Sequence, residues 1–282
     1  MLNPAGHRGF TLVEIMVALV VTLIVTGAVY NLLLNTQRLT RTQSARVALQ
    51  SSVRAGALIV ANELGELHAI SGGSTSQNDI LALGAHAVTY RAMRGIGFIC
   101  QSPGPGVIRL ARSSFSGHRD PQAGRDEALV FVPGDSATSS EDTWVPVKIA
   151  AVATTFACPG IGGPGITLTL STIPSLPLLE EGTPVRLIEP MELRLYESGE
   201  TWWLGARSVN TGEVIQPLAG PLAPQGFELE YLHYLGGPTM DPGSIGSIRV
   251  TIRAVEATPD PTRPALEEEL TTQITLRNSA VS

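Results

Sequence analysis

The sequence predicts an α+β protein in which one long N-terminal helix packs on a β-rich globular domain. Three observations carry this prediction. No charged side chain occurs between Ile15 and Gln37, no proline occurs between Pro4 and Pro103, and short alternating segments follow residue 71. Because proline breaks helix interiors, long helices are excluded after Pro103. The helix and the strands therefore occupy separate parts of the chain.

Composition narrows the class of protein. The 282 residues suffice for one large domain or two small ones, and a hydrophobic content of 43% is too high for a disordered chain. The net charge of -6 lacks the basic excess that binding to nucleic-acid phosphates requires, so no nucleic-acid partner is expected. The five histidines are scattered, and no Ser-His-Asp arrangement stands out. We predict neither a metal, a cofactor nor an enzymatic activity.

The first predicted element is a membrane-spanning helix over residues 10–34. The run from Ile15 to Tyr30 is apolar except for two threonines and one glycine, and with its flanks it reaches the roughly 20 residues that cross a bilayer core. A removable secretory signal would be shorter and would end in a small-residue cleavage site. Here the chain continues through Asn35 to Arg38 without such a site, so removal by a secretory signal peptidase is the poorer interpretation.

One carboxylate, Glu14, stands among these apolar residues. A carboxylate at membrane depth costs about 2.5–3.5 kcal/mol on insertion scales, and such a group is usually functional. The alternative is that Glu14 lies near the helix start, where it faces lipid headgroups and the positive end of the helix dipole.

The residues upstream of Glu14 resemble the class III signal of type IV pilins and pseudopilins. A short polar leader ends at Gly9, and Phe10-Thr-Leu opens the apolar run. The resemblance implies a pilin-like fold with residues 1–9 as a prepilin leader. It also implies that a membrane-embedded prepilin peptidase cuts between Gly9 and Phe10 and methylates the new amino terminus on Phe10.

Elementary electrostatics fits this family logic. Cleavage would leave a free amine on Phe10 that is mostly protonated at neutral pH. At about 4 Å and an effective dielectric constant of 20, pairing this amine with Glu14 of a neighbouring subunit gains roughly 4 kcal/mol before desolvation. That gain is comparable with the cost of inserting the lone carboxylate, so we expect Phe10 and Glu14 to set the register between assembled subunits.

The resemblance also implies partners and a location. The partners are the prepilin peptidase, other major and minor pilins, the inner-membrane pilus assembly platform and the membrane itself. The location is the bacterial inner membrane, crossed once with a cytoplasmic leader and an extracytoplasmic C-terminal domain, and the pilus after assembly. Two features depart from the family: Asn31 lies where many pilins have a proline, and Arg38, Arg41 and Arg46 after the span outnumber Arg8 before it. This charge asymmetry alone favours the opposite orientation.

Beyond the apolar run, residues 35–70 form an amphipathic continuation of the helix. Apolar residues recur at spacings of three, four or seven, which predicts a stripe that packs on a sheet. The members of this stripe are Leu49, Val53, Val60, Leu64 and Leu67. A single helix from about Phe10 to His68 would be roughly 90 Å long. The glycine- and serine-rich run from Ser71 to Asp79 would end it.

Residues 71–282 are predicted to form the β-rich extracytoplasmic domain. Alternation and β-branched content predict strands over residues 87–92, 96–101, 128–132, 145–152, 166–170, 184–189, 192–197, 202–208, 227–234, 247–255 and 271–277. The sequence from Glu197 to Glu200 predicts a hairpin turn, and the acidic segment Glu267–Glu269 a solvated loop.

Segments of this domain resemble the PilW-like minor pilins, with the J-type pseudopilins of type II secretion as relatives. The segments are residues 88–94, 216–219, 227–231, 248–252 and 274–278. The resemblance implies a low-abundance pilin of a tip or initiation complex. The alternatives are a type II secretion pseudopilin, a DNA-uptake pilin, and, from another class, a single-pass anchored domain that binds a ligand or catalyses hydrolysis.

A few further residues invite specific hypotheses. Cys100 and Cys158 would form either a structural disulfide, which we favour on the extracytoplasmic side, or two separate buried thiols. One of Trp202 and Trp203 would point away from a one-sided core and could contact a partner. The glycine-rich segment 160–165 lacks the residues of a phosphate loop and predicts a flexible hairpin loop. A calcium site could form among the loop aspartates, which are Asp120, Asp126, Asp135, Asp241 and Asp260.

Overall fold

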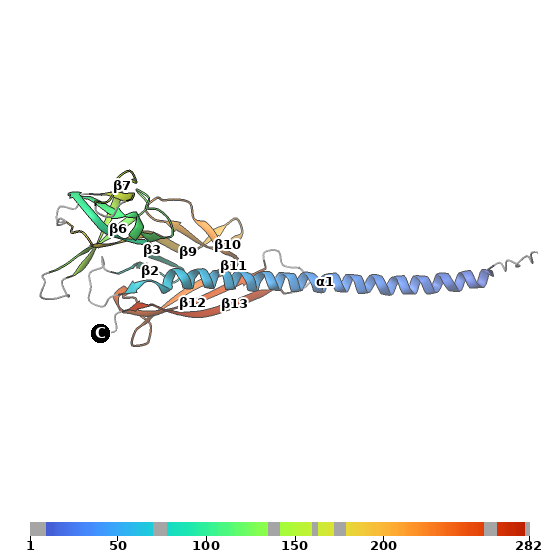
Figure 1. Cartoon of the computed structure of the whole chain (residues 1–282). Coiled ribbons are helices and arrows are strands. Elements are labelled where there is room, and N and C mark those ends of the chain that lie inside the picture. The colour runs from blue at the N-terminus through green and yellow to red at the C-terminus, as the bar shows by residue number, and fades with distance from the viewer. Residues whose placement is uncertain are drawn as a thin grey trace, which may run out of the picture. The chain divides into compact units, whose positions relative to one another are not determined.

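A computed structural model describes residues 10–69, 78–134, 142–159, 163–171, 179–256 and 264–279. The chain divides after Ala48 into two compact units. The first unit contributes the N-terminal part of helix α1, and the second holds the rest of α1 and every described strand (Figure 1). A long apolar helix and a β-rich domain on which its C-terminal turns pack confirm the predicted α+β class.

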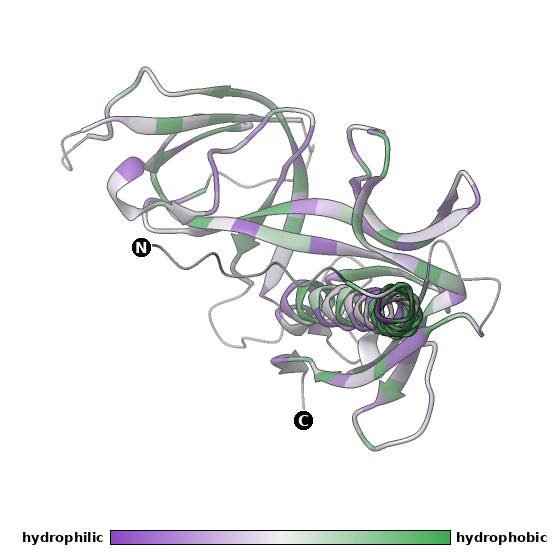
Figure 2. Cartoon of the chain, turned by 90° about the vertical axis from the view of Figure 1, so that its right-hand side faces the viewer, coloured by the Kyte–Doolittle hydropathy of each residue, from purple (hydrophilic) through white to green (hydrophobic). Residues whose placement is uncertain are grey.

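Helix α1 runs from Leu12 to Gly65 without interruption. In the first unit its apolar side chains are exposed, and Figure 2, which views the helix end-on, shows its N-terminal turns hydrophobic on all sides. Asn31, which lies where many pilins have a proline, donates a hydrogen bond from Nδ2 to the Gly27 carbonyl at 3.0 Å. The helix ends at Gly65, slightly before the predicted end at His68, because a turn at Leu67 leads directly into a strand.

In the second unit one stripe of α1 is buried against the sheet. The predicted apolar residues are all members of this buried core: Leu49, Val53, Val60, Leu64 and Leu67. Gly56 belongs to the same stripe, and a Cβ atom there would lie 3.1 Å from Ile252 Cδ1 and 3.2 Å from the Ala219 Cβ. Glycine at this position therefore allows a close approach between the helix backbone and the sheet.

The strands that the structure describes are β1 (His68–Ala69), β2 (Ile80–Leu83), β3 (Ala87–Gly104), β4 (Val107–Ala111), β5 (Ser116–Gly117), β6 (Glu127–Val132), β7 (Thr143–Ala153), β8 (Gly165–Leu170), β9 (Pro184–Ser198), β10 (Thr201–Ser208), β11 (Gln216–His233), β12 (Ile245–Val255), β13 (Glu267–Thr275) and β14 (Asn278–Ser279). Two short 3₁₀ helices accompany them, η1 (Arg112–Ser114) and η3 (Pro242–Ser244). A short parallel pair, β1 with β14, joins the end of the helix to the end of the chain.

The remaining strands form an antiparallel sheet with an open part and a closed part. In the open part the order is β13-β12-β11-β10-β9-β3-β2, and α1 packs on one of its faces. In the closed part, each strand pairs with the next in the order β9-β6-β7-β8-β4-β3. Because β3 and β9 also pair with each other, these six strands form a ring, which is a small β-barrel (Figure 2).

Each part has its own core. The open sheet and the helix share one cluster of buried residues, which includes the aromatic side chains of Tyr90, Phe227 and Tyr231. The barrel encloses a second cluster that includes Ile108, Val147 and Leu168. The strands β3 and β9 contribute to both cores, because each is long enough to pass from the open sheet into the barrel.

Several strand predictions need correction. The predicted pairs 87–92 with 96–101, and 184–189 with 192–197, are halves of β3 and β9. Strands β2, β4 and the first half of β11 were not predicted. The solvated loop over Glu267–Glu269 is wrong, because these residues open β13, where Glu269 lies opposite Arg253. The hairpin turn is confirmed, with Gly199 at a positive φ of 65°.

Candidate assembly site

The N-terminus of α1 is closed by three hydrogen bonds between Thr11 and Glu14, in which each residue both donates and accepts. The Thr11 backbone N–H donates to Glu14 Oε2 at 2.9 Å, and the Thr11 hydroxyl donates to the same oxygen at 3.1 Å. The Glu14 N–H in turn donates to Thr11 Oγ1 at 3.3 Å. This is a capping box, which satisfies helix-terminal N–H groups that would otherwise lack partners. In the structure, Glu14 therefore lies at the helix start, near the positive end of the helix dipole, as the alternative interpretation of this residue expected.

The capping box leaves room for a second partner. Both hydrogen bonds that the carboxylate accepts from Thr11 end on Oε2. Phe10 directly precedes the cap, and its side chain is 84% exposed. An amine created at Phe10 would thus lie at the same helix end as the Glu14 carboxylate. Gly9, on the leader side of the predicted cut, lies outside the described residues.

The rest of the first unit is an exposed apolar surface. Among the described residues, α1 is the one helix long and apolar enough to cross a membrane. Its apolar side chains from Leu12 to Leu33 are exposed in the first unit. Such a surface is stable only when lipid or other apolar helices cover it.

The disulfide alternative for the two cysteines is confirmed. Cys100 in β3 is bonded to Cys158, which follows β7, and their Cα atoms lie 5.8 Å apart. The bond ties β3 to the connection between β7 and β8 at one end of the barrel. Its place among buried residues identifies a structural staple.

The three loop aspartates that the structure describes each have a different partner. Asp120 binds Arg112, Asp126 binds Arg119, and Asp241 accepts a hydrogen bond from the Gly243 N–H at 3.1 Å. Asp135 and Asp260 lie outside the described residues, as do residues 160–162 of the predicted glycine-rich loop. Within the described ranges, no group of three acidic, histidine or cysteine side chains could hold a metal ion.

The two tryptophans are used within the chain. Trp202 packs against the core that the helix shares with the open sheet. Trp203 points to the other face, where its ring covers Gly220 so closely that a Cβ atom there would lie 2.6 Å from Trp203 Cε3. Trp203, the ring that points away from this core, thus has an intramolecular contact.

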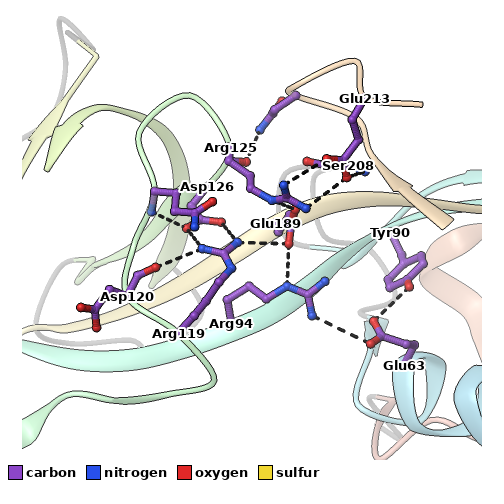
Figure 3. Close-up of polar contacts among 12 residues, drawn as sticks. Glu63, Tyr90, Arg94, Arg119, Asp120, Arg125, Asp126, Glu189, Ser208 and Glu213 are labelled. Carbon is purple, nitrogen blue, oxygen red and sulfur yellow. Dashed lines mark hydrogen bonds and ion pairs between the residues drawn. The ribbon is translucent and has the colours of Figure 1, made fainter. Parts of the chain in front are cut away.

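A buried network of charges lies where the sheet divides, and it was not predicted from the sequence (Figure 3). Its centre is Glu189, which is 2% exposed and lies on β9 between the residues that pair with β6 and those that pair with β10. Three arginines bind its carboxylate: Arg94 Nε at 2.7 Å, Arg125 Nε at 2.5 Å and Arg119 Nη2 at 3.2 Å.

The network extends from this centre in three directions. Arg119 holds both oxygens of buried Asp126 at 2.6 Å, and Arg125 holds both oxygens of Glu213 at 3.1 Å. Toward the helix, Arg94 Nη1 lies 3.9 Å from Glu63 of α1, which accepts a hydrogen bond from the Tyr90 hydroxyl at 3.0 Å. The chain of contacts therefore connects α1, the open sheet and the barrel (Figure 3).

The pKa shifts show that the network stabilises the charged forms of Glu189 and Arg119 and the neutral form of Tyr90. Burial alone would raise the pKa of the Glu189 carboxyl, but the hydrogen bond and charge of Arg94, supported by Arg125, hold this pKa below its ordinary value. The hydrogen bond to Asp126 raises the pKa of the Arg119 guanidinium against the opposing effect of burial. Burial, with the nearby Glu63 carboxylate, raises the pKa of Tyr90 well above its ordinary value.

Sequence reasoning had no signal for this network. The partners of Glu189 are separated from it by 64, 70 and 95 positions along the chain. Each residue alone is an ordinary charged side chain. These charges meet where the partner of β9 on one side changes from β6 to β10, while Glu189 stays paired with Ala92 of β3 on the other side.

Comparison with known proteins identifies one region of the chain. Residues 5–30 match the family model of the prokaryotic N-terminal methylation motif. No curated protein and no solved structure matches the chain. The matched region contains Gly9, Phe10 and Glu14, and the motif implies processing by a prepilin peptidase and incorporation with other pilins. Motif and helix together support a membrane-anchored protein of the type IV pilin or pseudopilin type.

Proposed function

We propose that this chain is a minor pilin of PilW-like type that contributes to the initiation and assembly of a type IV pilus. It is processed after Gly9, held in the inner membrane by α1 and incorporated through Phe10 and Glu14, and its role is assembly rather than catalysis. The observation that carries the proposal is the methylation motif at residues 5–30, placed directly at the start of an apolar helix. The resemblance of the strand segments to PilW-like proteins supports the minor role.

The geometry at the helix start supports the proposed pairing. Glu14 already accepts two hydrogen bonds from Thr11, which orient its carboxylate at the helix N-terminus. A protonated amine on the Phe10 of a neighbouring subunit would find an acceptor that needs little further ordering. In the low-dielectric membrane, this pair relieves the cost of an unpaired carboxylate, so it favours the assembled state.

The most direct test of processing is mass spectrometry of the protein isolated from its own membrane. The expected mature chain begins at Phe10 and carries one added methyl group. A Gly9→Val variant is expected to keep the leader and to be absent from pili. Pilus assembly by the uncleaved chain would contradict the proposal.

A pair of variants separates helix capping from pairing between subunits. Glu14→Gln removes the charge, and we expect it to be cleaved normally but lost from sheared pili by at least tenfold, as judged by immunoblotting. Thr11→Ala removes the capping hydroxyl and keeps the carboxylate, so it is expected to be incorporated. Equal incorporation of Glu14→Gln and the unaltered chain would exclude the pairing role, and equal failure of both variants would assign Glu14 to capping alone.

Deletion of the gene distinguishes the related systems. The proposal predicts loss of surface pili, with secretion of exoproteins and uptake of DNA measured in parallel. Loss of secretion alone would identify a type II secretion pseudopilin, and loss of DNA uptake alone a DNA-uptake pilin. Full function after replacement of Glu14 and retention of residues 1–9 would favour an anchored ligand-binding or hydrolytic domain.

A further inference from the structure

The open sheet has one long free edge. The barrel closes on itself, so its strands have neighbours on both sides, and the open part ends at β2 and β13. β2 has four residues, whereas β13 has nine and pairs with β12 along its whole length without a bulge. Among the described strands, β13 has no second neighbour. A regular edge without proline is a template for another strand.

The backbone groups that face this edge can be assigned. Hydrogen bonds from Leu276 N to Gly246 O and from Glu256 N to Leu266 O flank β13 at its two ends. Since hydrogen-bonded pairs alternate along an antiparallel ladder, the even-numbered residues of β13 bind β12. The odd-numbered residues turn N–H and C=O to the free edge, and all have exposed side chains: Glu267, Glu269, Thr271, Gln273 and Thr275.

The charge at this edge is negative. Glu267, Glu268 and Glu269 are consecutive at one end of β13. The cross-strand partner of Glu269 is Arg253, at 2.8 Å, and Glu268 accepts a hydrogen bond from Gln50 at 3.4 Å. Charged residues on an edge can also serve to keep other strands away. A strand bearing lysine or arginine would nevertheless find complementary charge here, whereas an acidic strand would be repelled.

A second copy of the chain fits this edge poorly. β13 runs parallel to the second-unit part of α1, because Gln50 contacts Glu268 near one end and Gly65 approaches Ile274 near the other (Figure 1). Antiparallel pairing of two β13 strands would therefore point these two helix segments in opposite directions, which conflicts with insertion in one membrane by the same end. Parallel pairing in register would place the glutamates side by side.

We infer that the free edge of β13 binds an extended, basic strand of a different pilin-type subunit by β-strand addition. Main-chain hydrogen bonds to the odd-numbered residues supply the affinity, and Glu267 with its neighbours selects for lysine or arginine. This inference rests on the proposed function, since it takes the partner from the same filament.

The test uses the full chain in detergent micelles and two synthetic peptides. One peptide alternates threonine with lysine, and the matched peptide alternates threonine with glutamate. Hydrogen exchange of the Glu269, Thr271 and Gln273 amides is expected to slow with the lysine peptide only. Equal protection by both peptides, or by neither, would overturn the inference.

Variants of one position supply the control. Thr271→Pro removes an edge-facing N–H and leaves the ladder to β12, so the lysine peptide should bind about three- to tenfold more weakly. Thr271→Ala keeps the N–H and should bind as the unaltered chain does. If Thr271→Pro unfolds, Glu267→Lys replaces it and should weaken the lysine peptide while admitting the glutamate peptide. Unchanged binding by these variants would refute the edge. The assay needs neither cleavage nor pili, so it can fail or succeed independently of the proposed function.

Discussion

At the scale of single residues, two carboxylates that stand between apolar residues in the sequence have opposite environments in the structure. Glu14 is exposed in the first unit and binds only the neighbouring Thr11 among the described residues. Glu189 is buried and meets three guanidinium groups from three different segments. The first carboxylate has spare capacity for a partner outside the chain. The second is saturated, so its effect is on the folded state of the chain itself.

Removing the charge at the centre of the network should be costly. Glu189→Gln leaves three half-buried arginines without their common partner, and we expect a loss of about 3 kcal/mol in the free energy of unfolding at pH 7. Urea unfolding of the full chain in micelles measures this loss. Glu228→Gln is the matched control, because Glu228 is exposed on β11, and it should change stability by less than about 0.5 kcal/mol.

The stability difference between the unaltered chain and Glu189→Gln should depend on pH. The pKa of Glu189 is lower in the folded chain than the roughly 4.3 of an unfolded glutamate. Its contribution is therefore complete above about pH 5 and is lost as the pH falls through the folded pKa. The stability difference between the unaltered chain and Glu189→Gln should be constant at neutral pH and shrink below about pH 4.3. A difference that grows in acid would contradict this assignment.

Whether the sequence reveals the role of a residue depends on how far along the chain its partners lie. Glu14 could be singled out because its signal is local: a glycine, a phenylalanine and a glutamate at fixed spacing. The cysteine pair was found because two cysteines in a domain expected outside the cytoplasm leave few alternatives. Glu189 could not be found, since its partners are brought together only by the folded sheet.

At the scale of elements, α1 has two different surfaces. Its N-terminal part is apolar on all sides, while its C-terminal part buries one stripe with Gly56 at the closest contact. Periodicity predicted this stripe correctly. The role of Gly56 was not evident from the sequence, where glycine in a helix indicated only a local cost of about 1 kcal/mol relative to alanine.

The close contact at Gly56 makes a sharp prediction. Gly56→Leu would force a side chain into the space held by Ile252 and Ala219, and overpacking of this kind costs about 1–3 kcal/mol. Ala55→Leu places the same side chain on the exposed neighbouring position and should be nearly neutral. Thermal unfolding followed by circular dichroism compares the two. Equal midpoints would show that the helix does not approach the sheet this closely.

The strands show why alternation alone was incomplete. β3 and β9 were each predicted as two strands, because Gly95 and Pro190 interrupt the apolar pattern near their middles. Those interruptions mark the place where each strand leaves the open sheet and enters the barrel. β13 was partly missed because three adjacent glutamates resemble a loop, although side chains on a strand alternate between two faces.

At the scale of the whole molecule, two cores are joined through the shared strands β3 and β9, and one covalent bond closes an end of the barrel. The disulfide between Cys100 and Cys158 closes a loop that contains most of the barrel, with a sequence separation of 58. In the chain-entropy model a loop of this size stabilises the folded state by roughly 4 kcal/mol.

Replacing both cysteines with alanine should therefore lower the free energy of unfolding by about 2–4 kcal/mol. The unaltered chain in reductant should approach the stability of the double variant, which is the internal control. Both proteins are compared by urea unfolding under the same conditions. A double variant as stable as the oxidised chain would show that the bond adds nothing to the folded state.

The pairing of β3 with β9 has one more consequence. Phe98 and Pro184 lie opposite each other in that ladder, and the strands that only the barrel uses all fall between them in the sequence. The barrel is thus an insertion at the tip of a hairpin that β3 and β9 would otherwise form. Excising it and rejoining the two ends through a tight turn would remove Arg119 and Arg125 and leave Arg94 as the remaining arginine bound to Glu189. Because α1 packs on the open sheet, a change of length at this tip would leave the contacts of the helix in place.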